Sequence, residues 1–253
     1  MKNIAIITGA SSGMGKEFFT CVADKYKELD EIWVIARRVD RLEELKKLCP
    51  EREVKTVVLD LTNEDSYEKF SSLLSEEETN VKILINNAGC GLLGNVEDMP
   101  YKGQIQMVDL NCRAMTALTT IALKHMHKDS FIINVCSIAA FCPNARMTVY
   151  SATKAFVFSY SKSLRFELKK KKLNVLAVCP GPMDTEFLPV AGITGNSKTF
   201  DMLPRCNPAM VAKNALKKAN KGRGIYTPRV FFKFYRVLAK LLPHGLMMHF
   251  SKT

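Results

Sequence analysis

The sequence predicts an α/β fold in which one domain is built on a doubly wound parallel sheet, and three observations support this. Short apolar runs rich in Ile and Val alternate with longer segments of helical period as far as Val178. The apolar runs are nearly continuous, which is typical of strands that helices cover on both faces. No linker interrupts this alternation. A strict strand-helix order predicts a parallel sheet with right-handed crossovers.

The elements follow in chain order. Strands are expected at residues 4–7, 31–36, 54–59, 81–85, 131–135 and 174–178. Helices are expected between them at residues 15–26, 41–48, 64–74, 101–125 and 148–171. The alternation then stops, because residues 180–208 contain five prolines and three glycines and show little periodicity. Such a long irregular connection is typical of a lid or a binding loop.

The C-terminal segment predicts a basic amphipathic helix. Arg229, Lys233, Arg236 and Lys240 fall on one helical stripe, and Phe and aliphatic residues occupy the rest of the helix. We interpret this helix as a cover of the substrate cleft or as a contact between subunits. Peripheral attachment to a membrane is the alternative. The apolar residues 242–250 that follow extend the same surface.

Composition restricts the class of protein. The chain is 47% hydrophobic and 25% charged, as in ordinary globular proteins. We interpret the net charge of +12 as basic residues spread through the alternating elements, and without a nucleic-acid-binding motif we expect no nucleic-acid partner. The eight cysteines never approach CxxC spacing, which predicts no metal site and a reducing compartment. Neither a signal peptide nor a transmembrane run is found, so a cytoplasmic location is expected.

A glycine-rich turn follows the first strand. Residues 8–15 read Thr-Gly-Ala-Ser-Ser-Gly-Met-Gly and continue directly into a helix. Glycines allow a tight turn and a close approach of the backbone to a ligand. The positive N-terminal end of the helix is suited to a pyrophosphate. This turn therefore predicts a dinucleotide site.

Tyr150 and Lys154 form a candidate acid-base pair. Their spacing of four residues places both side chains on one face of a helix. An ammonium group close to a phenol favours the phenolate, so we expect the pKa of Tyr150 to fall below its ordinary value of about 10. Tyr150 would then serve as general acid for carbonyl reduction and as general base for alcohol oxidation.

Together, these motifs resemble the short-chain dehydrogenase/reductase family over roughly residues 3–187. The resemblance rests on the turn TGxxxGxG, Asn-Asn-Ala-Gly at 86–89, Ser137, the YxxxK motif at 150–154 and Pro-Gly at 180–181, all in the family's order. It implies a Rossmann-type fold and a nicotinamide cofactor. It also implies that Ser137 hydrogen-bonds the substrate oxygen, that Lys154 holds the nicotinamide ribose, and that Asn111 supports a water-linked proton path to the lysine.

The resemblance also implies which residues bind the cofactor. Asp60 and Leu61 would flank the adenine, and the Pro-Gly segment would contact the carboxamide. The full set is Gly9, Ser11, Ser12, Gly13, Met14, Gly15, Arg37, Arg38, Asp60, Leu61, Asn87, Ala88, Gly89, Tyr150, Lys154, Pro180, Gly181, Met183 and Thr185.

The end of the second strand predicts NADP(H) rather than NAD(H). Ala36 stands where an acidic residue would bond a free ribose 2′-hydroxyl, and Arg37 and Arg38 follow it. A guanidinium is suited to the 2′-phosphate, and Arg37 is expected to be the main partner. Asp30 and Glu31 lie at the beginning of the strand, away from this edge. Ser12 replaces a basic residue of some NADP-linked members, so discrimination between the cofactors is expected to be less strict.

The predicted activity is the interconversion of a carbonyl and a secondary alcohol on a bulky hydrophobic molecule, with a hydroxysteroid favoured. The alternatives are a 3-oxoacyl thioester reductase and a non-catalytic NADP-binding regulator. Residues 1–187 are expected to form the cofactor and catalytic core, and residues 188–253 the substrate region, all within one domain. The two long helices at 101–125 and 148–171 predict a homodimer or homotetramer.

Overall fold

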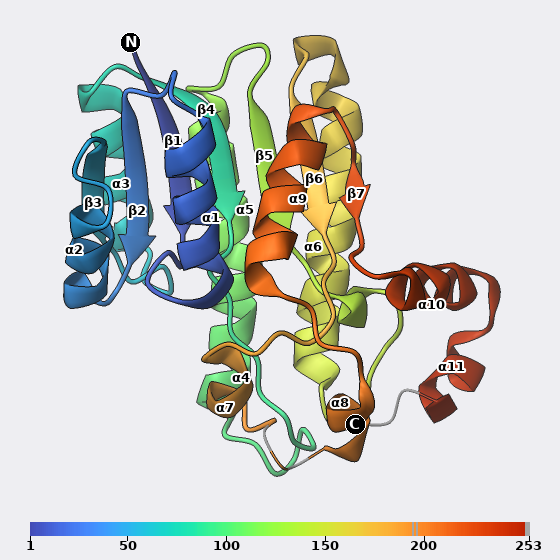
Figure 1. The fold of residues 1–253 in the computed structure, drawn as a ribbon. Coiled ribbons are helices and arrows are strands. Elements are labelled where there is room, and N and C mark those ends of the chain that lie inside the picture. Colours follow the sequence, from blue (N-terminus) through green and yellow to red (C-terminus); the bar gives the residue numbers. More distant parts are fainter. Residues whose placement is uncertain (194, 196, 251–253) are drawn as a thin grey trace.

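The computed structural model describes residues 1–193, 195 and 197–250, and within these residues it contains a seven-stranded parallel sheet (Figure 1). The strand order is β3-β2-β1-β4-β5-β6-β7. The strands are β1 (Lys2–Thr8), β2 (Glu31–Ala36), β3 (Glu53–Val58), β4 (Thr79–Asn86), β5 (Phe131–Val135), β6 (Asn174–Val178) and β7 (Ile225–Tyr226). The predicted parallel sheet is therefore confirmed. β7 was not predicted, because two residues are too few to show a pattern.

Helices cover both faces of the sheet. The α-helices of the described residues are α1 (Gly13–Lys25), α2 (Val39–Lys47), α3 (Asp65–Glu76), α4 (Tyr101–Val108), α5 (Met115–Leu123), α6 (Thr148–Glu167), α7 (Phe187–Val190), α8 (Lys198–Met202), α9 (Pro208–Asn220), α10 (Val230–Leu241) and α11 (His244–Phe250). One apolar core joins α1, α2 and α9 to one face, and a second joins α3, α5 and α6 to the other. This double burial explains why the strand sequences are nearly continuous in apolar residues.

The segment predicted as one helix at 101–125 is interrupted. A π-helical stretch, Asp109–Ala114, separates α4 from α5. Asn111 lies in this stretch, and its side-chain amide bonds the backbone of Cys90 on one side and Thr153 on the other. These contacts stabilise the irregular turn, and π-helical turns often occur at functional sites. Similarly, the helix predicted to reach residue 171 ends at Glu167 and continues as the 3-10 turn Leu168–Lys171.

The sheet order places a crevice at the carboxyl ends of the strands. The chain runs outward from β1 to β3 on one side and from β4 to β7 on the other, so the connections leaving β1 and β4 diverge. Ligands of open α/β sheets bind at such a switch point. In Figure 1 this edge faces α4, α7 and α8, while α10 and α11 project from the β7 side. Among the described residues, none of the helices is both long enough and apolar enough to cross a bilayer.

Candidate functional site

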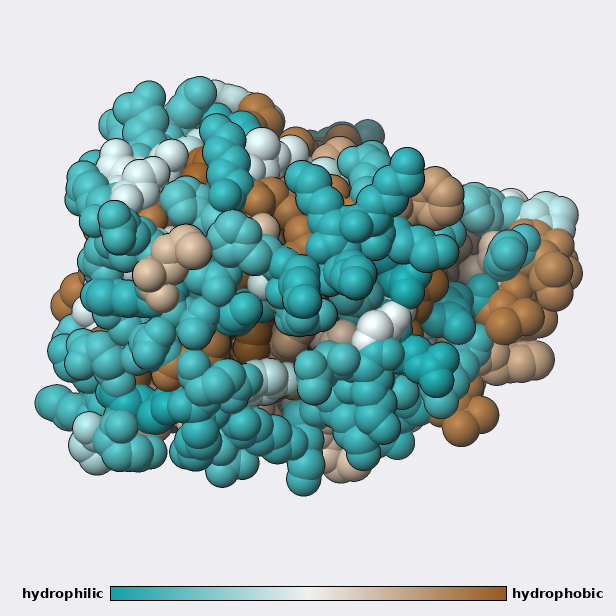
Figure 2. Space-filling view, turned by 90° about the horizontal axis from the view of Figure 1, so that it is seen from above, coloured by the Kyte–Doolittle hydropathy of each residue, from teal (hydrophilic) through white to brown (hydrophobic). Residues whose placement is uncertain are grey.

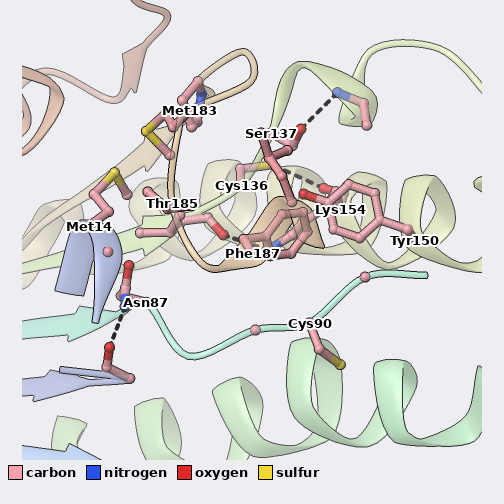
Figure 3. A pocket seen from close by; sticks show the side chains of 18 of the residues that line it. Met14, Asn87, Cys90, Cys136, Ser137, Tyr150, Lys154, Met183, Thr185 and Phe187 are labelled. Atoms are coloured by element: carbon pink, nitrogen blue, oxygen red, sulfur yellow. Dashed lines mark hydrogen bonds between the residues drawn. The ribbon is translucent and has the colours of Figure 1, made fainter. Parts of the chain in front are cut away.

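A cavity of about 820 Å³ lies at the switch point. Every predicted site residue lines it except Gly15 and Asn111. The lining residues from that set are Gly9, Ser11, Ser12, Gly13, Met14, Arg37, Arg38, Asp60, Leu61, Asn87, Ala88, Gly89, Ser137, Tyr150, Lys154, Pro180, Gly181, Met183 and Thr185. The fold thus brings together residues that lie far apart in the chain, as the close view in Figure 3 shows.

The turn after β1 is shaped by two glycines with positive φ. Gly9 has φ 64°, and its N–H donates to the Ile35 carbonyl at 2.8 Å. A Cβ on Gly9 would lie only 2.8 Å from the Cα of Ala88. Gly13, with φ 51°, faces the side chain of Thr185 across the cavity and begins α1. The backbone of this turn can therefore approach a ligand closely at the positive end of α1.

Gly15 serves packing rather than the cavity wall. A Cβ at this position would lie 2.1 Å from the carbonyl oxygen of Gly9 and 2.7 Å from Nδ2 of Asn87. Gly15 was predicted to contact the cofactor, but it does not line the cavity. The missing side chain lets α1 pack directly against the turn.

Thr8 links the glycine turn to the segment that follows β4. Its Oγ1 accepts hydrogen bonds from the backbone N–H groups of Asn87 and Ala88, both at 3.0 Å. Asn87 Nδ2 donates to the carbonyl oxygens of Thr8 and Gly9, at 3.0 and 3.1 Å. The two loops are thereby held in a fixed relation. Thr8 belongs to the quoted motif, but its structural role was not predicted.

The end of β2 presents two cations. Arg37 is exposed and lines the cavity beside Asp60. Burial alone would raise the pKa of Asp60, but hydrogen bonds from Thr62 and the charge of Arg37 lower it. Asp60 is therefore held as a carboxylate close to Arg37. Arg37, the predicted partner of the 2′-phosphate, is therefore exposed where it lines the cavity.

Arg38 bridges the two sides of the cavity. Its Nη2 donates to Ser11 Oγ at 3.1 Å and to Glu186 Oε2 at 2.9 Å. The hydrogen bond from Arg38 also lowers the pKa of Glu186. Glu186 lies just before α7, so this ion pair connects the end of β2 to the loop after β6. Glu186 was not predicted as a site residue.

The acidic residues at the beginning of β2 have structural roles. Glu31 accepts hydrogen bonds from Lys2 Nζ at 2.5 Å and from the indole of Trp33 at 2.8 Å. Asp30 accepts from the backbone N–H of Asn3 at 2.7 Å. Neither lines the cavity, as expected from their position at the beginning of β2, away from the cofactor edge.

Three polar side chains meet at the centre of the cavity. Ser137 caps the short turn Ile138–Ala140, and its Oγ accepts from the N–H of Ala139 at 3.1 Å. Tyr150 and Lys154 lie one turn apart on α6, as the spacing predicts. Lys154 Nζ donates to the Val135 carbonyl at 3.0 Å and lies 5.7 Å from the centroid of the Tyr150 ring. Figure 3 shows Ser137 and Tyr150 on the same side of the cavity.

The direction of the Tyr150 pKa shift is opposite to the one expected. Burial raises the pKa of Tyr150, and a hydrogen bond from Ser137 acts against this rise without outweighing it. Burial also lowers the pKa of Lys154, because an ammonium loses hydration there. The spacing in the sequence predicts that Tyr150 and Lys154 are neighbours, but it does not predict that both are buried.

Asn111 lies behind the cavity wall. It is buried, and its Oδ1 accepts from the N–H of Cys90 at 3.0 Å while its Nδ2 donates to Thr153 Oγ1 at 3.0 Å. A Cβ on Gly89 would lie 3.0 Å from Asn111 Oδ1 and 3.5 Å from Lys154 Nζ. Asn111 is therefore close to the lysine, with Gly89 between them. Its part in a water-linked proton path stays a prediction.

The Pro-Gly segment after β6 packs against the C-terminal helix. A Cβ on Gly181 would lie 2.2 Å from the ring of Phe232, which is completely buried on α10. The absence of a side chain at Gly181 therefore allows α10 to close one side of the cavity. Spacing alone could not show this contact, because 51 residues separate the two positions.

The other side of the cavity is apolar, and α10 contributes to it, in agreement with the interpretation of the basic C-terminal helix as a cover of the cleft. Tyr150 faces Phe187 with ring centroids 5.7 Å apart, and Gly91 packs against both rings. The unpredicted apolar lining residues from the helical region are Phe187, Leu188, Val190, Phe200, Leu203, Phe231, Phe232, Tyr235, Leu238, Leu242 and Met247. They come from α7 to α11 and the intervening loops. No motif marks them, and only the apolar character of the tail indicated such a wall.

Comparison with known proteins agrees with this geometry. A family model described as short chain dehydrogenase matches residues 3–192. An oxidoreductase of Staphylococcus aureus (strain N315) is 30% identical over 184 residues, which are 72% of this chain and 78% of that protein. A serine 3-dehydrogenase of Agrobacterium fabrum is 31% identical over 207 residues, 80% of each chain. A short-chain dehydrogenase from Sphingobium yanoikuyae in complex with NADPH has a TM-score of 0.79, 26% identity, and coverage of 98% of this chain and 95% of that one.

Proposed function

We propose that this chain, which belongs to the short-chain dehydrogenase family, interconverts a carbonyl and a secondary alcohol on a small hydrophobic molecule with NADP(H). Its family makes it an oxidoreductase. One observation carries the proposal. A single cavity joins Ser137, Tyr150 and Lys154 to Arg37 on one side and to an apolar wall on the other.

The residues of the cavity fit NADP(H). A pyrophosphate can approach the turn at Gly9 and Gly13, where positive φ and the lack of a Cβ leave the backbone accessible. Arg37 and Arg38 supply the cations that a 2′-phosphate requires, and no acid replaces Ala36. The Sphingobium protein, whose structure holds NADPH, gives further support. When bound, the reduced nicotinamide would supply the hydride for reduction of the carbonyl, and the oxidised nicotinamide would accept it from the alcohol.

Ser137, Tyr150 and Lys154 would bind the reacting groups and transfer the proton. Ser137 is suited to hydrogen-bond the substrate oxygen and to steady the negative charge that develops on it. Tyr150 would donate its phenolic proton to that oxygen during reduction and take a proton back during oxidation. The raised pKa keeps Tyr150 protonated, so the phenol carries the proton that reduction requires. Lys154, whose Nζ donates to the Val135 carbonyl, would bind the cofactor ribose.

The apolar wall supports a hydrophobic substrate, and we favour a hydroxysteroid. Aromatic and aliphatic side chains from α7 to α11 enclose this half of the cavity. Among the described residues, this wall contains no charged side chain except Glu186, whose carboxylate is paired with Arg38. An amino acid such as serine carries two charges that need partners. The wall therefore supports a substrate unlike that named for the Agrobacterium relative.

The deciding experiment is a substrate panel with NADPH and the full chain. Steroid ketones, 3-oxoacyl thioesters, aromatic ketones and serine are compared by kcat/KM. We expect the steroid ketones to react fastest. A preference for the thioesters would favour the alternative reductase. If the wild type binds NADPH but turns over no member of the panel, and Tyr150→Phe binds NADPH equally well, a non-catalytic regulator would be favoured.

We also propose a homodimer or homotetramer formed through α4 and α6. Tyr101, Ile105 and Val108 lie on one face of α4 and are exposed, as is Phe166 on α6. Exposed apolar faces on long helices are suited to a symmetric contact. Light scattering at micromolar concentration tests this, and a strict monomer would contradict it.

Two broader expectations remain proposals. The eight cysteines are all free thiols, which supports a reducing compartment such as the cytoplasm. The division at residue 187 is supported by the change from strand-helix alternation to short helices. Parts of the predicted substrate region, residues 194, 196 and 251–253, lie outside the described residues.

A further inference from the structure

The positive charge of this protein is concentrated at one end of the chain. Residues 202–253 contain 11 Lys and Arg and no Asp or Glu, whereas the first 201 residues contain 26 basic and 25 acidic residues. The interpretation that the excess is spread through the alternating elements is therefore wrong. Nearly the whole net charge of +12 belongs to the last fifth of the sequence. No carboxylate within this segment can neutralise it.

The surface of α10 carries three stripes of different character: an exposed apolar stripe, a basic stripe and a stripe that lines the cavity. Val230, Phe234, Val237 and Leu241 follow one another at spacings of four, three and four residues, so they share one face. Their exposed fractions are 78, 62, 49 and 72%. In Figure 2, brown atoms gather at the right-hand end of the molecule, where the C-terminal helices project. This outer stripe is thus an apolar surface without a partner among the described residues.

The two flanks of the outer stripe differ in chemistry. Lys233, Arg236 and Lys240 form the stripe on one side. Lys233 and Lys240 are exposed, whereas Arg236 is half-buried and donates to Thr227 Oγ1 at 3.1 Å. On the opposite flank, residues 231, 235 and 238 line the cavity. An apolar stripe with cations beside it is the pattern of a helix that lies in a membrane interface.

We propose that α10 docks this protein on an anionic lipid surface. The outer stripe would enter the boundary between headgroups and acyl chains, and Lys233 and Lys240 would contact the anionic headgroups. The cavity-lining flank of the same helix would then lie next to the membrane. This inference goes beyond the proposed function and does not depend on it, because docking requires no catalysis.

Two other occupants fit the surface less well. A second copy that packed its α10 symmetrically on this one would bring Lys233 and Lys240 close to their own counterparts, and the segment has no acid to pair with them. A nucleic acid would use the lysines but would leave Phe234 and Leu241 without an apolar partner. Of these three occupants, only an anionic lipid surface satisfies both the charges and the apolar stripe.

The test is sedimentation of the full chain with vesicles of phosphatidylcholine, alone or mixed with phosphatidylglycerol. We expect binding to the mixed vesicles that weakens as salt is raised. Lys233→Gln combined with Lys240→Gln should weaken binding about 25-fold, at about fivefold per lysine. Phe234→Ser combined with Leu241→Ser should weaken it at least as much, since both anchors are lost. None of these four residues lines the cavity.

Matched controls separate docking from general attraction. Lys213→Gln combined with Lys217→Gln removes the same charge from exposed positions of α9. Met210→Ser removes an exposed apolar residue from α9. Both controls should bind vesicles like the wild type, and circular dichroism verifies that every variant is folded.

Several outcomes would overturn the proposal. Absence of binding to mixed vesicles would do so directly. Equal loss in the α9 control would mean that the net charge alone attracts the protein. A dimer that dissociates when Phe234 and Leu241 are replaced, without vesicle binding, would assign the stripe to a second copy. Binding to duplex DNA in preference to vesicles, lost with Lys233 and Lys240, would assign it to nucleic acid.

Discussion

The two halves of the cavity are built in different ways. The cofactor half consists of short turns after β1, β2 and β4, where backbone conformation and hydrogen bonds set the shape. Thr8, for example, binds two consecutive backbone N–H groups of the turn after β4. The substrate half consists of α7, α8, α10 and α11, where packing of large side chains sets the shape.

This difference separates chemistry from selectivity. The match to the short chain dehydrogenase model ends at residue 192, soon after α7, so it includes Ser137, Tyr150 and Lys154 but not α8 to α11. A turn fixed by its backbone can bind the same cofactor in many proteins, whereas an apolar wall changes its shape with each side chain. The first half should therefore tolerate few substitutions, and the second should alter substrate choice first.

The largest expected effect is that of Tyr150→Phe. Removal of the phenolic oxygen leaves the ring against Phe187 but eliminates the transferable proton, so kcat should fall by about 10²- to 10⁴-fold. NADPH affinity, measured by calorimetry, should stay nearly unchanged. Tyr160→Phe is the matched control, because Tyr160 lies on the same helix outside the cavity. Turnover within a few-fold of wild type in Tyr150→Phe would refute the assigned acid.

The next effect tests how the two halves are joined. Phe232→Ala should destabilise the fold by about 3–5 kcal/mol, because a completely buried ring against Gly181 is lost. Urea unfolding measures this, and Phe234→Ala, which replaces an exposed ring on the same helix, should cost no more than about 0.5 kcal/mol. If catalytic activity is lost at a lower urea concentration than the one that unfolds the protein, α10 opens as a separate unit. Equal costs for the two variants would show that α10 does not hold the cavity wall.

The fold was predictable because strands buried on both faces and helices of regular period leave strong patterns. Strands β2, β5 and β6 agree with the predicted bounds at both ends. The π-helical stretch was not predictable, because it depends on contacts of Asn111 with Cys90 and Thr153 rather than on local sequence. α9 was overlooked although Asn207 caps it and Pro208 begins it, which is a recognisable start signal.

The site was predictable where spacing determines geometry. Four residues on one helix place Tyr150 and Lys154 together, but their pKa shifts depend on burial, which spacing does not contain. Gly15 was predicted to bind the cofactor, whereas the structure shows a packing role that depends on the position of the Gly9 carbonyl. Phe232 and Glu186 reach the cavity only through tertiary packing. A count of charges by segment would have revealed the basic C-terminal region from the sequence alone.

A smaller effect is expected at the phosphate end of the cofactor half. Arg37→Ala should reduce the preference for NADPH over NADH by about ten- to a hundredfold, since one charge-assisted contact of roughly 1.5–3 kcal/mol is lost. The ratio of kcat/KM for the two cofactors measures it. Arg41→Ala, an exposed position on α2 outside the cavity, is the control and should leave the ratio unchanged. A wild type that prefers NADH would contradict the cofactor assignment.

The smallest effect concerns the contact between the two halves at Arg38 and Glu186. The pair is about half exposed, so its strength is at most about 1 kcal/mol. While Glu186 holds Arg38, the guanidinium is less available to a 2′-phosphate. Glu186→Gln should therefore raise NADPH affinity by up to about fivefold and leave NADH affinity unchanged.

The pH dependence of cofactor affinity sharpens this last prediction. Arg38 lowers the pKa of Glu186, so the carboxylate and the ion pair persist at neutral pH and are lost only as the pH falls through that lowered pKa. The advantage of Glu186→Gln should accordingly shrink toward acidic pH, where the wild-type carboxyl also becomes neutral. Calorimetric titration of both proteins with NADPH and NADH measures the difference. A fall in NADPH affinity in Glu186→Gln would mean that Glu186 positions Arg38 for the phosphate instead of competing with it.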